Sequence, residues 1–152
     1  MIMDMLVNLY NLKEEYSKNE DFEIKRILSP NIHLLEKFIL DNFWPGWASE
    51  AKAACYKSNP SCFIATVNNE IVGFACYDAT TKGFFGPLGV AEKHRKKGIA
   101  KQLILRSMYA MKEEGYAYAI IGGANPKVVE YYKRVCGAIE IPHTNDVYSR
   151  MV

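Results

Sequence analysis

Hydrophobic and polar residues alternate with two different periodicities along the chain, and these periodicities predict strands and helices in a definite order. Continuous apolar runs or apolar–polar alternation are typical of strands, and apolar residues three and four positions apart are typical of helices. Strands are expected at 6–10, 22–27, 61–67, 71–77, 84–91, 116–121, 138–141 and 147–151. Helices are expected at 29–42, 47–57, 99–114 and 126–135, with one or two further helical turns at 13–18.

The order of these elements predicts how the strands pair. The strands between residues 22 and 91 follow one another closely enough to form an antiparallel meander. The strand, helix and strand between residues 86 and 121 predict a parallel crossover. The expected fold class is therefore α/β (α+β), with a mixed, mostly antiparallel central sheet flanked by helices and a ligand at the ends of the central strands.

Turn residues set the expected boundaries of these elements. Asn68-Asn69-Glu70 lies between two apolar runs and predicts a hairpin turn. Ser29-Pro30 predicts a helix start, and Gly115 predicts a helix end. Gly122-Gly123 is interpreted as a flexible turn, or as a place where a ligand approaches the backbone closely.

One stretch carries chemistry as well as structure. An apolar strand ends near Ala91, a basic turn with Gly98 follows, and an amphipathic helix begins at Ile99. The start of a helix offers unpaired N–H groups and a partial positive charge, which together favour an anion. Arg95, Lys96 and Lys97 add full positive charge beside it, so the turn predicts a ligand that carries phosphate.

The turn has a recognisable spacing. Arg95-Lys96-Lys97-Gly98-Ile99-Ala100 resembles the (Gln/Arg)-x-x-Gly-x-(Gly/Ala) signature of the GNAT superfamily of acyl-CoA-dependent N-acetyltransferases. Neither a kinase-type phosphate loop nor a Gly-x-Gly-x-x-Gly dinucleotide fingerprint is present. The resemblance implies that acetyl-CoA is the co-substrate and that the turn cradles its pyrophosphate. It implies as cofactor-binding residues Leu88, Gly89, Val90, Arg95, Lys96, Lys97, Gly98, Ile99, Ala100, Lys101, Asn125 and Tyr132.

A second motif supports the same resemblance. Asn125 and Tyr132 have the separation of the Asn and Tyr that recur on the family's penultimate helix, where the Asn holds the pantetheine arm and the Tyr points at the thioester sulfur. The segment from Tyr132 to Gly137 is one residue longer than in the commonest members, so the role can fall to Tyr131 or Tyr132. The resemblance covers 22–152 of a single domain spanning 1–152, and 1–20 is expected to be an N-terminal extension outside the common core.

Acetyl transfer sets further requirements. The resemblance implies that the Val90 N–H stabilises the thioester carbonyl and that Tyr132 protonates the departing thiolate. The general base is sought among Glu92, Asp78 and Glu50, in that order, with a water relay as the alternative. Four large side chains could line the acceptor pocket or simply form core: Trp44, Trp47, Tyr77 and Phe85. Asp78 is also placed in this candidate pocket.

Composition narrows the function classes. The chain has 152 residues, 49% of them hydrophobic, with a formal net charge of +2, which argues against nucleic-acid binding through the basic turn. No apolar run approaches membrane-spanning length, and no residues have metal-ligand spacing, so no membrane partner and no metal are expected. Four scattered cysteines are expected to be reduced packing residues of a cytoplasmic protein.

The expected function is transfer of an acetyl group to a primary amine of a small molecule or a protein. A non-catalytic acyl-CoA-binding or sensing module of the same fold is the alternative. The resemblance implies that homodimers are common, and the N-terminal strand is one place where such an interface could lie.

Overall fold

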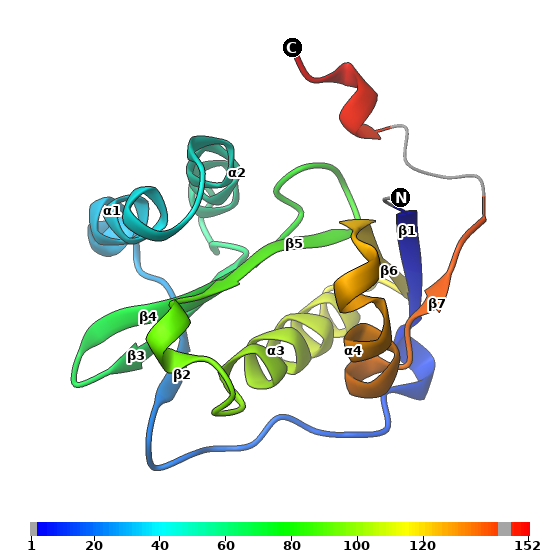
Figure 1. The fold of residues 1–152 in the computed structure, drawn as a ribbon, viewed down its shortest axis with the longest axis horizontal. Helices are drawn as coiled ribbons and strands as arrows, with labels where there is room; N and C mark the ends of the chain where they lie inside the picture. The colour runs from blue at the N-terminus through cyan, green and yellow to red at the C-terminus, as the bar shows by residue number, and fades with distance from the viewer. Residues whose placement is uncertain (1–2, 143–146) are drawn as a thin grey trace.

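A computed structural model describes residues 3–142 and 147–152 and contains one seven-stranded mixed sheet (Figure 1). The strand order is β2-β3-β4-β5-β6-β1-β7, and every pairing is antiparallel except that of β5 with β6. The strands are β1 (Met3–Asn8), β2 (Glu23–Arg26), β3 (Cys62–Val67), β4 (Glu70–Tyr77), β5 (Phe84–Val90), β6 (Tyr118–Ala124) and β7 (Ile139–Glu140). This confirms the predicted fold class, the meander and the parallel crossover.

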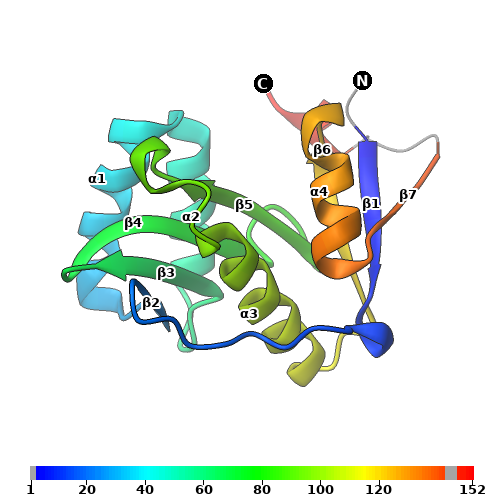
Figure 2. The ribbon, with the colours of Figure 1, turned by 60° about the horizontal axis from the view of Figure 1, so that its bottom comes forward.

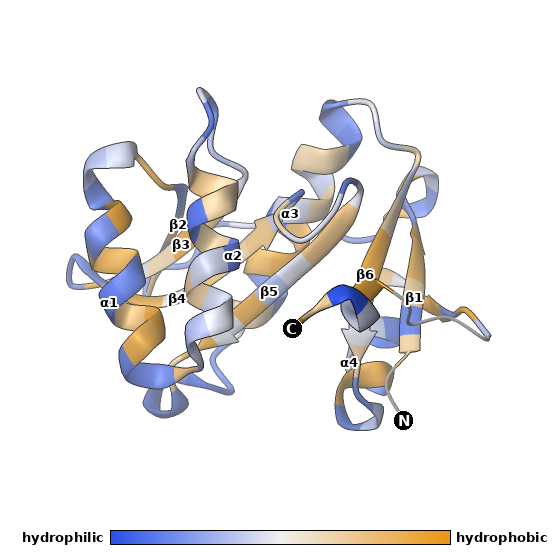
Figure 3. Cartoon of the chain, turned by 90° about the horizontal axis from the view of Figure 1, so that it is seen from above, coloured by the Kyte–Doolittle hydropathy of each residue, from blue (hydrophilic) through white to orange (hydrophobic). Residues whose placement is uncertain are grey.

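Helices cover both faces of the sheet. α1 (Ile32–Asn42) and α2 (Pro45–Cys55) lie on one face, and α3 (Ile99–Glu113) and α4 (Pro126–Cys136) lie on the other (Figures 1 and 2). Each face has its own hydrophobic core. Figure 3 shows that much of β5 and β6 is coloured as hydrophobic. The apolar spacing of α1 places Leu35 and Ile39 in the core under α1 and α2, as periodicity predicts. Within the described residues, no helix is long and apolar enough to cross a bilayer.

The hairpin between β3 and β4 forms as the sequence predicts. Asn68 and Asn69 have φ angles of 50° and 63°. Positive φ at both central residues is the geometry of the tight hairpin turns that match strand twist, and Asn tolerates it better than most residues. α2 begins at Pro45, two residues before its predicted start, because proline is well suited to the first helical position.

The prediction of a flexible turn at Gly122-Gly123 is wrong, because both residues lie inside β6. A Cβ on Gly122 would lie 2.6 Å from the Phe84 ring, so the glycine is needed for close approach of that ring. The Gly123 N–H donates to the Asp4 carboxylate of β1 over 3.1 Å. The two glycines therefore continue the strand rather than end it.

The N-terminal segment is integrated into the sheet. β1 pairs with β6 along one edge, and on the other edge β7 pairs with it at Met5 and Leu6. The predicted helical turns at 13–18 are absent, and that segment crosses α3 in irregular conformation. Ser17 N–H donates to the Gln102 side chain, and the Tyr16 and Tyr109 rings meet edge to face, so contacts with α3 replace local helical bonds.

The prediction of a strand at 147–151 is also wrong. Residues Val147–Arg150 form a short 3₁₀ helix, η4, instead of a strand. The strand predicted at 138–141 is present as the two-residue β7. All four cysteines, Cys55, Cys62, Cys76 and Cys136, are buried and free, which confirms their predicted packing role.

Candidate functional site

The two parallel strands at the centre of the sheet separate soon after they meet. β5 and β6 pair only at Phe84 with Ile120 and at Phe85 with Ile121. Beyond that point β5 carries a bulge. Ala75 lies opposite Leu88 and Tyr77 opposite Phe85, so Gly86 and Pro87 of β5 together face the single residue Cys76 of β4. The divergence of β5 and β6 is visible in Figure 3. It opens the carboxyl ends of both strands, where ligands bind in open α/β sheets.

Backbone groups of β5 face this opening. The Ala91 N–H donates to the Val72 carbonyl over 2.8 Å, so the backbone polar groups of Ala91 point toward β4. In an antiparallel pair the backbone N–H and C=O groups of successive residues point alternately toward and away from the partner strand. Those of Val90 and Leu88 therefore point away from β4. Consistent with this, the Val90 carbonyl accepts a hydrogen bond of 3.1 Å from Arg95 Nε. The N–H groups of Leu88 and Val90 are thus directed to the side where β6 has departed.

The basic turn has the geometry of an anion site. Gly98 is the N-cap of α3, with φ of 85°, and no side chain caps the helix. A Cβ on Gly98 would meet nothing within 4 Å, so the space in front of the helix is open. The first intrahelical bond runs from Gln102 N–H to the Gly98 carbonyl, which leaves the N–H groups of the preceding turn without helical acceptors. Those donors and the helix dipole favour an anion here.

A cavity of about 610 Å³ lies in front of this turn, and we call it the loop cavity. Its lining residues are Glu14, Val90, His94, Arg95, Lys96, Gly98, Ile99, Ala100, Lys101, Tyr131, Arg134 and Val135. Lys97 of the predicted set is exposed and does not line it. The cavity thus combines the helix start with several positive side chains.

Four residues that line the loop cavity were not predicted as site residues: Glu14, His94, Arg134 and Val135. Lys101 Nζ lies 2.8 Å from the Glu14 carboxylate, which comes from the segment before β2. His94 Nδ1 is buried and has no hydrogen-bond partner within the described part of the chain. Burial, and then the charges of Lys97 and Lys93, lower the pKa of His94. No local pattern could have joined Glu14 to Lys101 across 87 positions, and His94 resembled any other surface histidine.

A second cavity of about 880 Å³ lies where β5 and β6 diverge, and we call it the cleft cavity. Its lining side chains come from α2, β5, β6, α4 and η4. The aromatic members are Trp44, Trp47, Phe85, Tyr132 and Tyr148. Leu88 lines the cleft cavity and Val90 lines the loop cavity, so the two cavities border the same strand.

Helix α4 presents its two tyrosines to different cavities. Tyr131 lines the loop cavity, and Tyr132 lines the cleft cavity, with its ring edge-on to Phe85 at a centroid distance of 6.5 Å. Burial raises the pKa of Tyr132 well above its usual value, so its hydroxyl stays protonated. Asn125 also lines the cleft cavity, and its side-chain oxygen caps α4 by accepting from Lys127 N–H over 2.9 Å.

The three carboxylates considered as bases lie in different places. Glu50 lines the cleft cavity and accepts a hydrogen bond from the Thr80 hydroxyl. Glu92 is exposed on the turn after β5 and lines neither cavity. Asp78 accepts hydrogen bonds from the Tyr116 hydroxyl and from Gly83 N–H, and it too lies outside both linings. Of the three, Glu50 is the carboxylate that the structure brings to the cleft cavity.

Of the four aromatic residues predicted for an acceptor pocket, three line the cleft cavity and one does not. Trp44, Trp47 and Phe85 line the cleft cavity. Tyr77 is fully buried under the sheet instead, where its hydroxyl donates to Glu114 and accepts from Arg26. Gly89 packs against the Phe43 ring, which a Cβ would approach to 2.6 Å. Tyr77 and Gly89 therefore line neither the loop cavity nor the cleft cavity.

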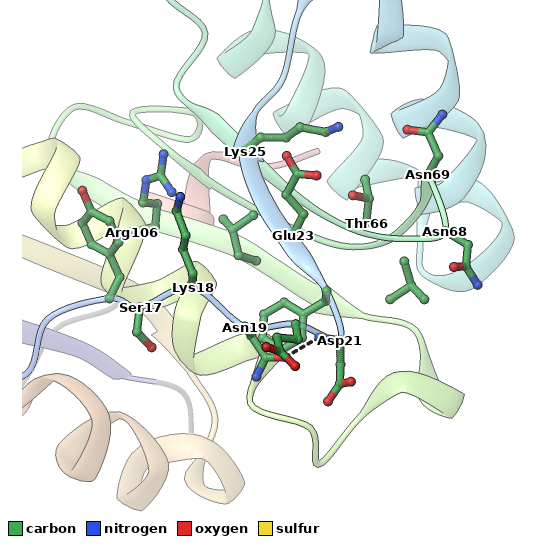
Figure 4. A pocket seen from close by; sticks show the side chains of 15 residues that line it. Ser17, Lys18, Asn19, Asp21, Glu23, Lys25, Thr66, Asn68, Asn69 and Arg106 are labelled. Atoms are coloured by element: carbon green, nitrogen blue, oxygen red, sulfur yellow. Dashed lines mark hydrogen bonds between the residues drawn. The ribbon is translucent and has the colours of Figure 1, made fainter.

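A third cavity, of about 970 Å³, lies away from all predicted site residues (Figure 4). Polar side chains of the segment before β2, of the β3–β4 hairpin and of α3 surround it, and its acidic and basic residues are equal in number. Figure 4 shows Lys18 and Arg106 on one side of it and Asn68 and Asn69 on the other. Its described lining includes neither residues of the basic turn nor any other residue predicted for the site.

No curated protein matches the chain. A GNAT N-acetyltransferase structure from Sphaerobacter thermophilus is 18% identical with a TM-score of 0.73, covering 92% of this chain and 48% of that one. The aminoglycoside N-acetyltransferase AAC(6')-Iy, solved in complex with CoA, is 17% identical with a TM-score of 0.63, covering 84% of this chain and 93% of that one.

A glucosamine N-acetyltransferase region of a fungal multi-domain β-N-acetylglucosaminidase is 15% identical with a TM-score of 0.73, and the match covers 92% of this chain but 20% of that one. At these identities the structures share the fold, and the chain spans less than half the length of the fungal and Sphaerobacter proteins. The model of the acetyltransferase (GNAT) family matches residues 12–138. Since that match spans most of the sequence, the chain belongs to the GNAT acetyltransferase family.

Proposed function

We propose that the chain transfers an acetyl group from acetyl-CoA to a primary amine by direct attack of the amine on the thioester. The observation that carries this proposal is the uncapped start of α3 at Gly98, which opens into the loop cavity beside the diverging strands. A diphosphate fits there because the helix N–H groups and the cationic side chains of Arg95, Lys96 and Lys101 converge on open space.

The chain's own groups can serve each step. The Val90 N–H, directed into the opening, is placed to stabilise negative charge that develops on the thioester carbonyl oxygen. The amine nitrogen forms the new C–N bond as the C–S bond breaks, and the thiolate takes a proton from the Tyr132 hydroxyl. The proton lost by the amine passes to water or to the Glu50 carboxylate, which lines the same cavity as Tyr132.

Calorimetry with acetyl-CoA tests the binding half of this proposal. Gly98→Asp places a carboxylate in front of the helix start and should weaken acetyl-CoA binding at least tenfold. Gly115→Asp is the matched control, because Gly115 also has positive φ and open space but lies beyond the other end of α3. Equal losses in the two variants would show that the anion site is elsewhere.

Release of free CoA over a panel of primary amines tests the transfer half. A non-catalytic module of the same fold would bind acetyl-CoA without releasing CoA at a rate that depends on any amine. Amine-dependent release supports the transferase, and tight binding with no release from any amine would favour the module.

A further inference from the structure

The charged residues that line the cleft cavity are not those expected of a site that binds an acceptor with several positive charges. Among the described residues that line it, Glu50 is the single acidic side chain and Arg150 the single basic one. A ligand with several ammonium groups would leave most of them facing apolar or neutral surface without a partner, which is costly. One carboxylate suits one ammonium group.

The walls around that carboxylate are aromatic. Trp47 is fixed by edge or tilted contacts with Phe43 and Phe74, at centroid distances of 5.1 and 6.1 Å. Trp44 is 48% exposed and lines the cavity from the position before α2. Its indole lies over Gly46, where a Cβ would come within 2.1 Å of the ring. The absence of a side chain at Gly46 thus allows the Trp44 ring to fold back along the first turn of α2.

Glu50 follows Trp47 by three positions on α2, so both side chains lie on the same side of the helix. The Thr80 hydroxyl donates to its carboxylate. Tyr148 of η4 lines the same cavity, and burial, and then the Glu50 charge, raise the pKa of its phenol. Among the described residues, the neutral Thr80 hydroxyl is the donor seen on this carboxylate and no salt bridge to it is present, although Arg150 lines the same cavity.

We propose, building on the proposed transferase function, that the acceptor is a small monocationic amine with an aromatic body. The indoles of Trp44 and Trp47 pack against the ring, and Glu50 attracts the ammonium group before it loses its proton. Aromatic faces also favour a nearby cation. A cavity of about 880 Å³ falls in the size range of small-molecule sites.

Binding is tested directly on the acetyl-CoA-free protein by quenching of tryptophan fluorescence. 2-Phenylethylamine is expected to quench at concentrations at least tenfold lower than either 3-phenylpropionate, which reverses the charge, or spermidine, which adds charges and removes the ring. Glu50→Gln should reduce the preference of 2-phenylethylamine over 3-phenylpropionate to less than threefold. Equal or tighter binding of spermidine would overturn the inference.

Turnover provides the second measurement. Trp44→Ala should raise KM for 2-phenylethylamine at least tenfold and change KM for ethylamine less than twofold. Gly46→Ala, which keeps the indole but displaces it, should have the same selective effect, so a folding defect in one variant does not hide the result. Tyr56→Ala is the control, since Tyr56 is an exposed aromatic residue just after α2 that does not line the cavity.

The outcomes separate this inference from the proposed function. Faster turnover of spermidine or of the aminoglycoside kanamycin than of 2-phenylethylamine would overturn the aromatic monocation and leave the transferase standing. Selective binding of 2-phenylethylamine with no CoA release from any amine would support the acceptor site and overturn the transferase.

Discussion

Arg95 Nε donates a hydrogen bond of 3.1 Å to the carbonyl oxygen of Val90, and this bond ties the basic turn to the end of β5. The carbonyl belongs to the residue whose N–H is directed into the opening between β5 and β6. One side chain thus links the two halves of the site, the strand that would hold the thioester and the turn that would hold the diphosphate.

Removing that donor should loosen the turn. A hydrogen bond from a charged group contributes about 1.5–3 kcal/mol, so Arg95→Met is expected to weaken CoA binding roughly tenfold to a hundredfold. Arg95→Gln keeps an N–H that can reach the Val90 carbonyl and should retain most of the affinity. Calorimetry with CoA measures both variants. Equal losses in the two would show that the guanidinium charge, and not the link to Val90, determines affinity.

The two tyrosines of α4 can be separated by single substitutions. Tyr132→Phe removes the hydroxyl in the cleft cavity and keeps the ring against Phe85, so stability should change little. Because the thiolate is a better leaving group than an alkoxide, loss of the acid should lower kcat modestly, by about tenfold. Tyr131→Phe should leave kcat unchanged and affect only KM for acetyl-CoA, since Tyr131 lines the loop cavity.

The raised pKa of Tyr132 fixes the direction of its pH effect. Because burial favours the neutral phenol, the proton donor is retained as pH rises through the usual phenol pKa of about 10. The fall in kcat caused by Tyr132→Phe should therefore be the same at pH 7 and pH 9. A loss that disappears at pH 9 would indicate that the tyrosine has already ionised there and that its burial does not protect the proton.

Much of this arrangement could be predicted from local sequence. The apolar strand, the glycine turn and the amphipathic helix from 84 to 113 each have a local signal, and the structure has all three. The Asn68-Asn69 hairpin could also be predicted from local sequence, since its turn geometry depends on two adjacent residues.

Long-range contacts account for the errors. Gly122 and Gly123 have the composition of a turn, but the Phe84 ring and the Asp4 carboxylate, both distant in sequence, keep them in a strand. The ranking of Glu92 above Glu50 as a candidate base followed the closeness of Glu92 to β5 in the sequence, and it stays a prediction. Helix α2, whose position over the opening depends on tertiary packing, brings Glu50 to the cleft cavity instead.

Binding of CoA should be coupled to protonation of His94. In the free protein the pKa of His94 lies below its usual value because of burial and the charges of Lys97 and Lys93. A bound diphosphate would favour the imidazolium form, so CoA affinity should rise as pH falls from 8 to 6, with proton uptake. Folding responds oppositely. The unfolded chain binds the proton more readily, so His94 lowers stability as pH falls through about 6.5.

Calorimetry of CoA binding in buffers of different ionisation enthalpy measures that proton uptake. CoA phosphate groups titrate in the same range, so the contribution of His94 is the difference between the protein and His94→Gln. His33→Gln is the matched control, because His33 is exposed on α1, away from both cavities. Identical proton uptake in all three proteins would contradict the coupling.

The Glu14 carboxylate is expected to oppose CoA binding. It lies 2.8 Å from Lys101 Nζ and lines the loop cavity, so it competes with a diphosphate for the same cation. Both side chains are partly exposed, and such a pair contributes about 0–1 kcal/mol, so Glu14→Gln should cost little stability. Removing its negative charge should tighten CoA binding by about twofold to fivefold at low salt. Because salt screens exposed charges, the gain should shrink at ~1 M salt.

Glu113→Gln, at the last residue of α3, removes an exposed carboxylate far from the helix start and should leave affinity unchanged. If Glu14→Gln instead weakens binding, the ion pair helps to position Lys101 for the diphosphate, and the carboxylate is a supporting group and not a competitor.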